Sequence, residues 1–190
     1  MYLIFDTETT GLPKKYKAPI EELDNWPRIV QIAWQLFNEN ETCISKKDYI
    51  IKPNGFIIPD NAAKIHGITT KRAVDEGHLI EPVLKEFSKE IKKTDHIIAH
   101  NLDFDEKIIS AEFLRSKIKH SLHDINKICT MKASTKFCKL PHQYGGLKWP
   151  NLQELYIFLF KSEFEDMHNA SADVNACAKC FFELKKRNVL

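Results

Sequence analysis

The chain has 190 residues, of which 43% are hydrophobic and 28% are charged, a mixture typical of a globular protein with a substantial core. A typical domain holds about 100–200 residues, so we expect a single domain over residues 1–190. The net charge of +2 excludes a uniformly basic nucleic-acid coat protein, and no apolar run approaches the roughly 18 residues that span a bilayer.

The first part of the chain is rich in extended segments. We predict strands over residues 2–6, 29–37 and 43–52, and the turn-like residues 38–42 predict that the last two form a hairpin. Between the first two strands, residues 13–28 form a long loop, and long loops in compact domains are often functional or mobile.

Helices follow from residue 60 onward. Short helices are expected at residues 60–66 and 73–76, and a longer one at residues 81–93 has apolar residues at helical spacing, namely Val83, Leu84, Phe87 and Ile91. A strand at residues 96–99 precedes a helix at residues 103–117, with one face assigned to Phe104, Ile108, Ala111 and Leu114.

The remaining elements are a strand at residues 124–129 and helices at residues 130–137, 151–160 and 170–186. Three strands, then a strand–helix–strand unit, then helices indicate an α/β fold, a mixed five-stranded sheet flanked by helices.

Two acidic residues, Asp6 and Glu8, stand where the first strand ends. Residues i and i+2 of a strand point to the same face, so both carboxylates can converge on one point at the edge of the sheet. Ligand sites of open α/β sheets favour such edges. The alternative is that both acids simply lie in solvent at the strand end.

A second acidic stretch, IIAHNLDFD, follows the strand at residues 96–99 and opens the next helix. Asp103 fits an N-cap or first-turn position, where an acid stabilises the helix. Asp105 can face back across the same sheet edge as Asp6. Taken alone, this stretch is compatible with helix capping.

A third stretch, MHNASADVN, contains His168 and Asp173. Five residues of helix turn by about 140° beyond a full circle, so both side chains can meet only if His168 lies in the loop before the helix. Read alone, His168 is compatible with a surface loop. The acids and this histidine together, with oxygen ligands predominating, predict a site for two Mg²⁺ or Mn²⁺ ions.

The motifs FDTETTG, HNLDFD and HNASAD, in this order, resemble the three exonuclease motifs of the DEDD superfamily of 3′–5′ exonucleases. The superfamily includes the proofreading epsilon subunit of bacterial DNA polymerase III, ribonuclease T and oligoribonuclease. The resemblance runs from Tyr2 to about Leu184 and implies a ribonuclease H-like fold. It assigns four metal-binding acids and one general base, namely Asp6, Glu8, Asp105, Asp173 and His168.

The position of the base distinguishes two branches of this superfamily. A tyrosine would lie four residues before the last aspartate, where this chain has Asn169, and a histidine lies five before it, at His168. The chain therefore resembles the histidine branch. Asp103 is an additional acid at a variable position of the second motif.

The resemblance also implies a pocket for one terminal nucleotide. RIVQIAWQL resembles the second strand of the family, and AAKIHGIT resembles a loop near that nucleotide. We expect the substrate to be bound by Thr9, Thr10, Leu12, His66 and Asn101.

Two tryptophans have open roles. The loop at residues 13–28 carries three lysines and Trp26, which together either hold single-stranded backbone and stack a base or form a solvated flap. Trp149 fits a core or loop anchor.

The implied reaction is hydrolysis of the terminal phosphodiester of single-stranded DNA, releasing nucleoside 5′-monophosphates, in proofreading or repair. An imidazole such as that of His168 can accept a proton near neutral pH. Alternatives are an RNA 3′-end trimming exoribonuclease and a non-catalytic nucleic-acid-binding module. The expected partners are a DNA or RNA 3′ end and a DNA polymerase subunit, with the chain as monomer or homodimer.

Five scattered cysteines and an N-terminus without a signal peptide predict reduced thiols and a cytoplasmic protein. The lone pair Cys177 and Cys180 lies in a predicted helix, where a plain position on the helix face is favoured over zinc binding.

Overall fold

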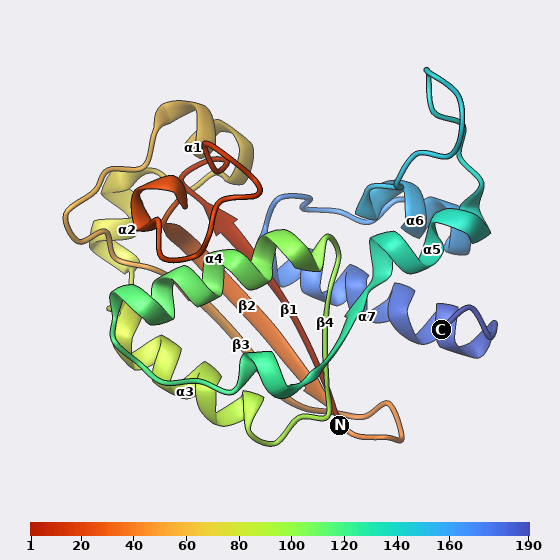
Figure 1. Ribbon diagram of the computed structural model, residues 1–190, viewed down its shortest axis with the longest axis horizontal. Helices are drawn as coiled ribbons and strands as arrows, with labels where there is room; N and C mark the ends of the chain where they lie inside the picture. The colour runs from red at the N-terminus through yellow and green to blue at the C-terminus, as the bar shows by residue number, and fades with distance from the viewer.

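The structure, a computed structural model, describes residues 1–190 and contains a five-stranded sheet with helices on both faces (Figure 1). The strands are β1 (Tyr2–Thr9), β2 (Ile29–Phe37), β3 (Cys43–Ile50), β4 (His96–Ala99) and β5 (Asn126–Cys129), in the order β3-β2-β1-β4-β5. β2 runs antiparallel to β1 and β3, whereas β1, β4 and β5 are parallel. The predicted mixed sheet and the β2–β3 hairpin are confirmed.

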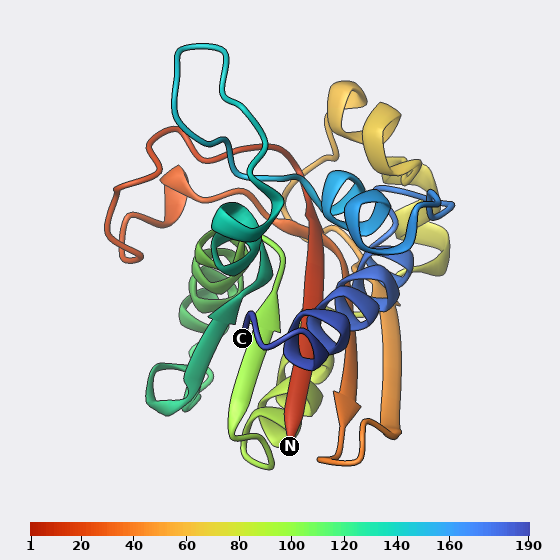
Figure 2. The same ribbon diagram turned by 90° about the vertical axis from the view of Figure 1, so that its right-hand side faces the viewer.

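The helices cover the two faces of this sheet unequally (Figure 2). They are α1 (Asp60–His66), α2 (Thr70–Glu76), α3 (Ile80–Ile91), α4 (Leu102–Arg115), α5 (Thr130–Cys138), α6 (Leu152–Phe160) and α7 (Ala170–Lys186), with short 3-10 helices at Leu23–Asn25 and Leu122–Asp124. α3 and α4 pack on one face, and α7 packs on the other, where it crosses β1 and β2 and is backed by α5 and α6.

β1 contributes to both apolar layers because its side chains alternate between the two faces. Leu3 and Phe5 lie in the larger core with Phe87 of α3, whereas Ile4 lies with Val174 of α7. All five side chains are almost fully buried, and each such side chain contributes about 1.5–3 kcal/mol to folding. The same alternation continues to the polar end of the strand and decides where its acids point.

The predicted apolar stripe of α3 is confirmed, since its four residues are all buried. The predicted face of α4 is partly wrong, because Leu114 is 45% exposed. The buried face of α4 includes the predicted Ile108 and Ala111 together with Ile109 and Phe113, and all four lie in the larger core.

β1 is longer than the predicted residues 2–6. It continues to Thr9 because β2 pairs with it as far as Thr9 and Ile29, with an irregularity between Glu8 and Thr9. Asp6 and Glu8 are therefore held inside a hydrogen-bonded strand, opposite Ala33 and Gln31. The alternation of side chains along the strand therefore fixes the direction of both carboxylates.

The loop at residues 13–28 is anchored to the core. Trp26 is 3% exposed and its indole N–H donates to the carbonyl of Pro19 at 3.0 Å, so the alternative in which it stacks a base is wrong. Arg115 donates to two carbonyls of the loop, and Arg28 pairs with the buried Glu112.

The predicted helix placement of Cys177 and Cys180 is confirmed: both lie on α7 and are buried in apolar clusters. No helix in the structure combines the length and the apolar character needed to cross a bilayer.

Candidate active site

The carboxyl end of β1 presents its acids and its threonine to opposite faces of the sheet. Asp6 and Glu8 share the face of Ile4, which α7 covers, and Thr7 shares the face of Phe5, which α4 approaches. The side chains at the end of β1 therefore point alternately toward α7 and toward α4.

Asp105 is held in place by Thr7. The backbone N–H and the hydroxyl of Thr7 both donate to Oδ1 of Asp105, at 3.1 and 2.8 Å. Asp105 lies in the first turn of α4, which begins after Asn101, a residue in the left-handed conformation with φ of 70°. Asparagine is one of the few non-glycine residues that adopt this conformation readily. The sharp turn places α4 directly beyond the end of β4.

Asn101, and not Asp103, is the N-cap of α4. Asp103 lies in the first helical turn and forms an ion pair with Lys132 of α5. The expectation of a helix-terminal role for Asp103 is therefore confirmed in its first-turn form.

His168 lies in the loop before α7, as predicted. Its backbone has a φ of 62°, and its N–H donates to Oδ2 of Asp173 at 3.1 Å. Asn169 caps the helix by accepting from the N–H groups of Ser171 and Ala172. The left-handed residue turns the chain back, so that a residue outside the helix meets an acid of its first turn.

Gln31 of β2 ties α7 to the sheet. Its side-chain oxygen accepts from the N–H of Ala170 at 3.2 Å, and its nitrogen donates to Asp48 of β3 at 2.8 Å. Since Gln31 also faces Glu8 across the strand pair, it positions the start of α7 relative to the acids of β1.

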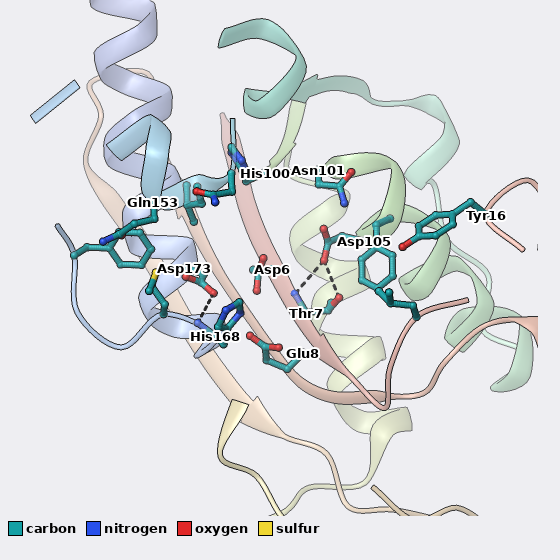
Figure 3. A pocket seen from close by; sticks show the side chains of 16 residues that line it. Asp6, Thr7, Glu8, Tyr16, His100, Asn101, Asp105, Gln153, His168 and Asp173 are labelled. Atoms are coloured by element: carbon teal, nitrogen blue, oxygen red, sulfur yellow. Dashed lines mark hydrogen bonds between the residues drawn. The ribbon is translucent and has the colours of Figure 1, made fainter. Parts of the chain in front are cut away.

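These elements bring the four predicted acids and His168 to one cleft (Figure 3). Ligand atoms of Glu8, His168 and Asp173 lie within 4.8 Å of one another, and Asp6 lies between Asp173 and Asp105. The cleft has a volume of about 400 Å³ and is also lined by Thr7, Leu12, Tyr16, His100, Asn101, Phe104, Asn151, Leu152, Gln153, Phe164 and Met167.

The two acids of β1 are unfavourable as anions without a cation. Burial raises the pKa of Asp6 well above its ordinary value, and the nearby carboxylates of Asp105, Asp173 and Glu8 raise it further. Burial and the charges of Asp173 and Asp105 raise the pKa of Glu8 to about 8. Both effects disfavour the charged form.

The two acids carried by helices are partly relieved by hydrogen bonds. Burial raises the pKa of Asp105 to about 7 although the two bonds from Thr7 lower it. Burial raises the pKa of Asp173 to about 6, against the lowering effect of the His168 N–H. Near neutral pH the four acids therefore compete for protons.

This donor set fits divalent cations. Clustered carboxylate oxygens without a thiolate are the ligands that Mg²⁺ and Mn²⁺ prefer. A cation would offset the mutual repulsion that raises these pKa values, and it would displace the protons that the acids hold. Asp6, Glu8 and Asp173 are the residues best placed to hold it, with Asp105 on the other side of Asp6.

A family model described as Exonuclease (RNase T) matches residues 3–181. The chain belongs to this exonuclease family. The match covers the three motifs and the elements that carry all four acids and His168, and it agrees with the predicted DEDD superfamily. No curated protein sequence matches the chain significantly.

Solved structures show the same fold in exonuclease I. The E. coli enzyme in complex with a dT13 oligonucleotide is similar over 98% of this chain and 41% of that chain, with 19% identity and a TM-score of 0.77. A product-bound structure of exonuclease I covers 99% of this chain and 44% of that chain, with 18% identity and a TM-score of 0.75. This exonuclease-family chain thus spans about two fifths of the length of exonuclease I, and the likeness shows a ribonuclease H-like fold.

A second hollow, of about 470 Å³, adjoins the cleft and contains three of the predicted substrate residues. Thr9, Leu12 and His66 line it, together with apolar side chains that include Ile65 and Phe104. Leu12 is 72% exposed and lines both spaces. Its position fits the expected contact with a base.

His66 is a buried member of this hollow. Burial lowers the pKa of its ring, and its Nδ1 accepts from the N–H of Ile68 at 3.1 Å. The neutral ring therefore carries its proton on Nε2. Gly67, with φ of 72°, ends α1 directly after His66 in a left-handed cap that favours glycine.

The other two predicted substrate residues, Asn101 and Thr10, do not line this second hollow. Asn101 lines the cleft with the acids, whereas Thr10 lines neither space. The Thr10 hydroxyl instead accepts from the N–H of Arg28 at 3.0 Å, and Thr9 donates to the carbonyl of Gly11 at 2.7 Å. The structure gives Thr10 a role in holding the turn after β1.

Sequence reasoning missed several residues of the cleft. Tyr16 reaches the cleft from the loop at residues 13–28, and Gln153 reaches it from the first turn of α6. His100 is the first residue of the motif HNLDFD, so its place in that motif could have marked it as a residue of the cleft. The other two lie in segments that carry no motif.

Proposed function

We propose that this chain is a divalent-metal-dependent 3′–5′ exonuclease that hydrolyses the terminal phosphodiester of single-stranded DNA and releases nucleoside 5′-monophosphates. The observation that carries the proposal is the convergence of four carboxylates, one buried and three half-buried, and His168 at the carboxyl end of β1. Membership of the exonuclease family supports it. The structural neighbour that is bound to dT13 supports a single-stranded DNA substrate.

The acids are proposed to hold two Mg²⁺ or Mn²⁺ ions, principally through Asp6, Glu8 and Asp173. Such ions supply the positive charge that activates a water and stabilises the departing 3′ oxygen. Asp105, aimed by Thr7, completes the anionic cluster from the side of α4.

His168 is proposed to accept the proton of the attacking water. It is exposed on the cleft side of the acids, and its backbone is fixed by Asp173. A free imidazole at the solvent side of the cluster can pass the proton to bulk water after each turnover. General bases of this kind contribute about 10²–10⁴-fold to rate.

The adjoining hollow is proposed to bind the terminal nucleoside. Its apolar lining suits a base, and Leu12 and Phe104 belong to both the hollow and the metal-binding cleft. A base held there would place the phosphodiester on the 5′ side of the terminal nucleoside over the acids. Single strands would be preferred, because a paired end must first lose its stacking.

The test is product analysis with 5′-labelled DNA and RNA oligomers of one sequence in Mg²⁺. We expect DNA ladders that shorten from the 3′ end, and nucleoside 5′-monophosphates as the released product. Asp6→Asn should be inactive and should keep a cooperative melting transition, whereas Asp124→Asn, an exposed acid outside the cleft, should match the wild type.

Absence of terminal release by the wild type, or turnover by Asp6→Asn, would overturn the proposal. Faster digestion of RNA than of DNA would assign the chain to the exoribonuclease alternative.

A further inference from the structure

The stretch from Ile125 to Gln153 has an unusual charge. It contains five lysines and no acidic residue, although the whole chain carries a net charge of only +2. The rest of the chain is therefore net negative. This stretch includes β5, α5 and the segment at residues 139–151, which we call the arm.

The arm has a defined backbone but little packing. Pro141 pairs with Leu147, and the N–H of Lys148 donates to the carbonyl of Leu140 at 3.0 Å, so the arm folds back on itself as a narrow hairpin. Two glycines with positive φ, Gly145 and Gly146, form its tip. The arm projects from the body of the molecule in both views (Figures 1 and 2).

Two aromatic side chains of the arm face solvent. Tyr144 is 86% exposed and Trp149 is 62% exposed, so the predicted anchoring role of Trp149 is wrong. The other two tryptophans, Trp26 and Trp34, are buried. Two large aromatics exposed on one projecting hairpin form a candidate surface for contact with a ligand.

The cations beside these aromatics are partly free. Lys132 pairs with Asp103 and Lys148 pairs with Glu154, whereas Lys136 and Lys139 are exposed and form no ion pair. Exposed aromatics and free lysines in one segment are the combination that binds single-stranded nucleic acid, through base stacking and phosphate contacts.

The base of the arm is fixed to the cleft by His100. The Nε2 of His100 lies 3.0 Å from the carbonyl of Pro150, and its Nδ1 lies 3.0 Å from the hydroxyl of Thr130. Burial lowers the pKa of His100 to about 4, so its ring is neutral. Since a carbonyl only accepts, Nε2 carries the proton and the Thr130 hydroxyl donates to Nδ1. His100 thereby joins the arm to the end of β4.

The C-terminal end of the arm also forms part of the cleft lining. Asn151 lines the cleft, and two residues of chain span at most about 7 Å, so the backbone of Trp149 lies at the cleft rim. The loop at residues 13–28 brings Tyr16 to the cleft, and in Figure 1 this loop lies at the upper left, whereas the arm projects at the upper right. The cleft thus opens between two projecting segments.

We propose that the arm and the adjoining end of α5 bind the single strand that lies 5′ of the terminal nucleotide. Trp149 and Tyr144 of the arm stack on bases, and Lys136 of α5 and Lys139 of the arm contact phosphates. This inference rests on the proposed exonuclease function. The stacking platform lies outside the cluster of acids, so it sets affinity for long substrates and leaves the chemical step unchanged.

The first test compares a dT15 oligonucleotide with a dT2 dinucleotide, whose single phosphodiester lies over the acids and which has no strand extending 5′ beyond the cleft. A stacked base is worth about 5–150-fold in affinity, so Trp149→Ala and Tyr144→Ala should each raise the KM for dT15 by about 10-fold. The rate with dT2 should stay within about 2-fold of wild type. Ile44→Ala, an exposed apolar residue on the edge strand β3, is the matched control and should change neither value.

The lysines are tested through salt dependence. Each phosphate contact contributes about 0.7 to the slope of log affinity against log salt for single strands, so Lys136→Ala/Lys139→Ala should reduce the slope for dT15 by about 1.4. Lys46→Ala, an exposed lysine of β3, should leave the slope unchanged.

A binding measurement separates this inference from the proposed chemistry. Because Trp149 is the exposed indole, dT15 in EDTA should quench part of the tryptophan fluorescence of wild type, and this change should vanish in Trp149→Phe. Phenylalanine still stacks, so Trp149→Phe should keep a KM near that of wild type.

Equal KM values for dT15 in wild type and Trp149→Ala, or equal losses on dT15 and dT2, would overturn the inference. If wild type hydrolyses neither substrate, the proposed function fails, and the quenching titration then decides the role of the arm alone. Quenching by dT15 that persists in Trp149→Phe would also count against the arm.

Discussion

The backbone N–H of His168 donates to Oδ2 of Asp173 at 3.1 Å, so the main chain of the proposed base is bound to a proposed metal ligand. The bond involves no atom of the imidazole. Replacing the ring should therefore remove the base without disturbing the acid, which separates proton transfer from metal binding.

His168→Ala should lower kcat by about 100-fold or more, since this is the contribution of a typical general base. The Asp173 hydrogen bond is retained by the backbone, so Mg²⁺ affinity measured by calorimetry should change by less than about 3-fold. Added imidazole should restore part of the rate. His123→Ala, which removes an exposed histidine outside the cleft, is the control. A pH–rate profile identical to that of wild type would reject His168 as the base.

Metal removal gives the second prediction. EDTA should stop hydrolysis, and Mg²⁺ or Mn²⁺ should restore it, because only a divalent cation offsets the repulsion among Asp6, Glu8, Asp105 and Asp173. The rate should be measured on single-stranded DNA during titration of each ion. Restoration by zinc alone would contradict the assignment of hard oxygen ligands.

The raised pKa values also predict how stability depends on pH. Ordinary aspartates and glutamates ionise near pH 4, whereas Glu8 has a pKa of about 8, Asp105 of about 7 and Asp173 of about 6. Between these limits the folded state binds more protons than the unfolded state, so each group lowers the free energy of unfolding as pH rises. The metal-free protein should lose stability from about pH 4 to about pH 8.

Glu8→Gln should remove part of this loss. In EDTA at pH 8, the substitution removes an unfavourable charge and so raises the free energy of unfolding. Its Tm should exceed that of wild type by on the order of 5 °C, since 1 kcal/mol of unfolding free energy shifts Tm by about 2–4 °C in a protein of this size. At pH 4 the two proteins should melt together, because Glu8 is protonated in both states. Glu39→Gln, in the exposed turn after β2, should change neither Tm. Equal Tm values at pH 8 would refute the raised pKa of Glu8.

Much of this site could be predicted from the sequence because its motifs are local. β4 (His96–Ala99) and α7 (Ala170–Lys186) were predicted with the boundaries that the structure has, since each begins or ends at a strong polar signal. The position of His168 before the helix followed from helical geometry alone. The acids were therefore correctly placed at one edge of the sheet.

The errors arose at residues whose secondary structure or burial depends on tertiary contacts. β1 extends past Asp6 because β2 is available to pair with it, which no local pattern reveals. Trp26 is buried and Trp149 exposed, the reverse of the expectation, because burial depends on how each loop docks. The contact of Thr7 with Asp105 joins residues 98 positions apart and was likewise invisible.

That contact supplies the last prediction. Thr7→Val keeps the shape of a side chain that is 6% exposed, but it removes the hydroxyl that donates to Asp105 at 2.8 Å. The hydrogen bonds from Thr7 lower the pKa of Asp105, which burial has raised to about 7, so their partial loss should raise that pKa further. More Asp105 is then protonated near neutral pH. We expect kcat/KM at pH 7 to fall by about 10-fold or more, in line with the loss of about 1.5–3 kcal/mol for a hydrogen bond to a charged group.

The loss in Thr7→Val should shrink as pH rises to 8.5, because Asp105 ionises there even without the hydroxyl. Thr7→Ser, which keeps the donor, should stay within about 3-fold of wild type across the range. The measurement is kcat/KM on single-stranded DNA at saturating Mg²⁺ from pH 6 to pH 9. If the valine and serine variants have the same pH profile, the hydroxyl does not act on Asp105, and Thr7 contributes only its backbone N–H and its packing.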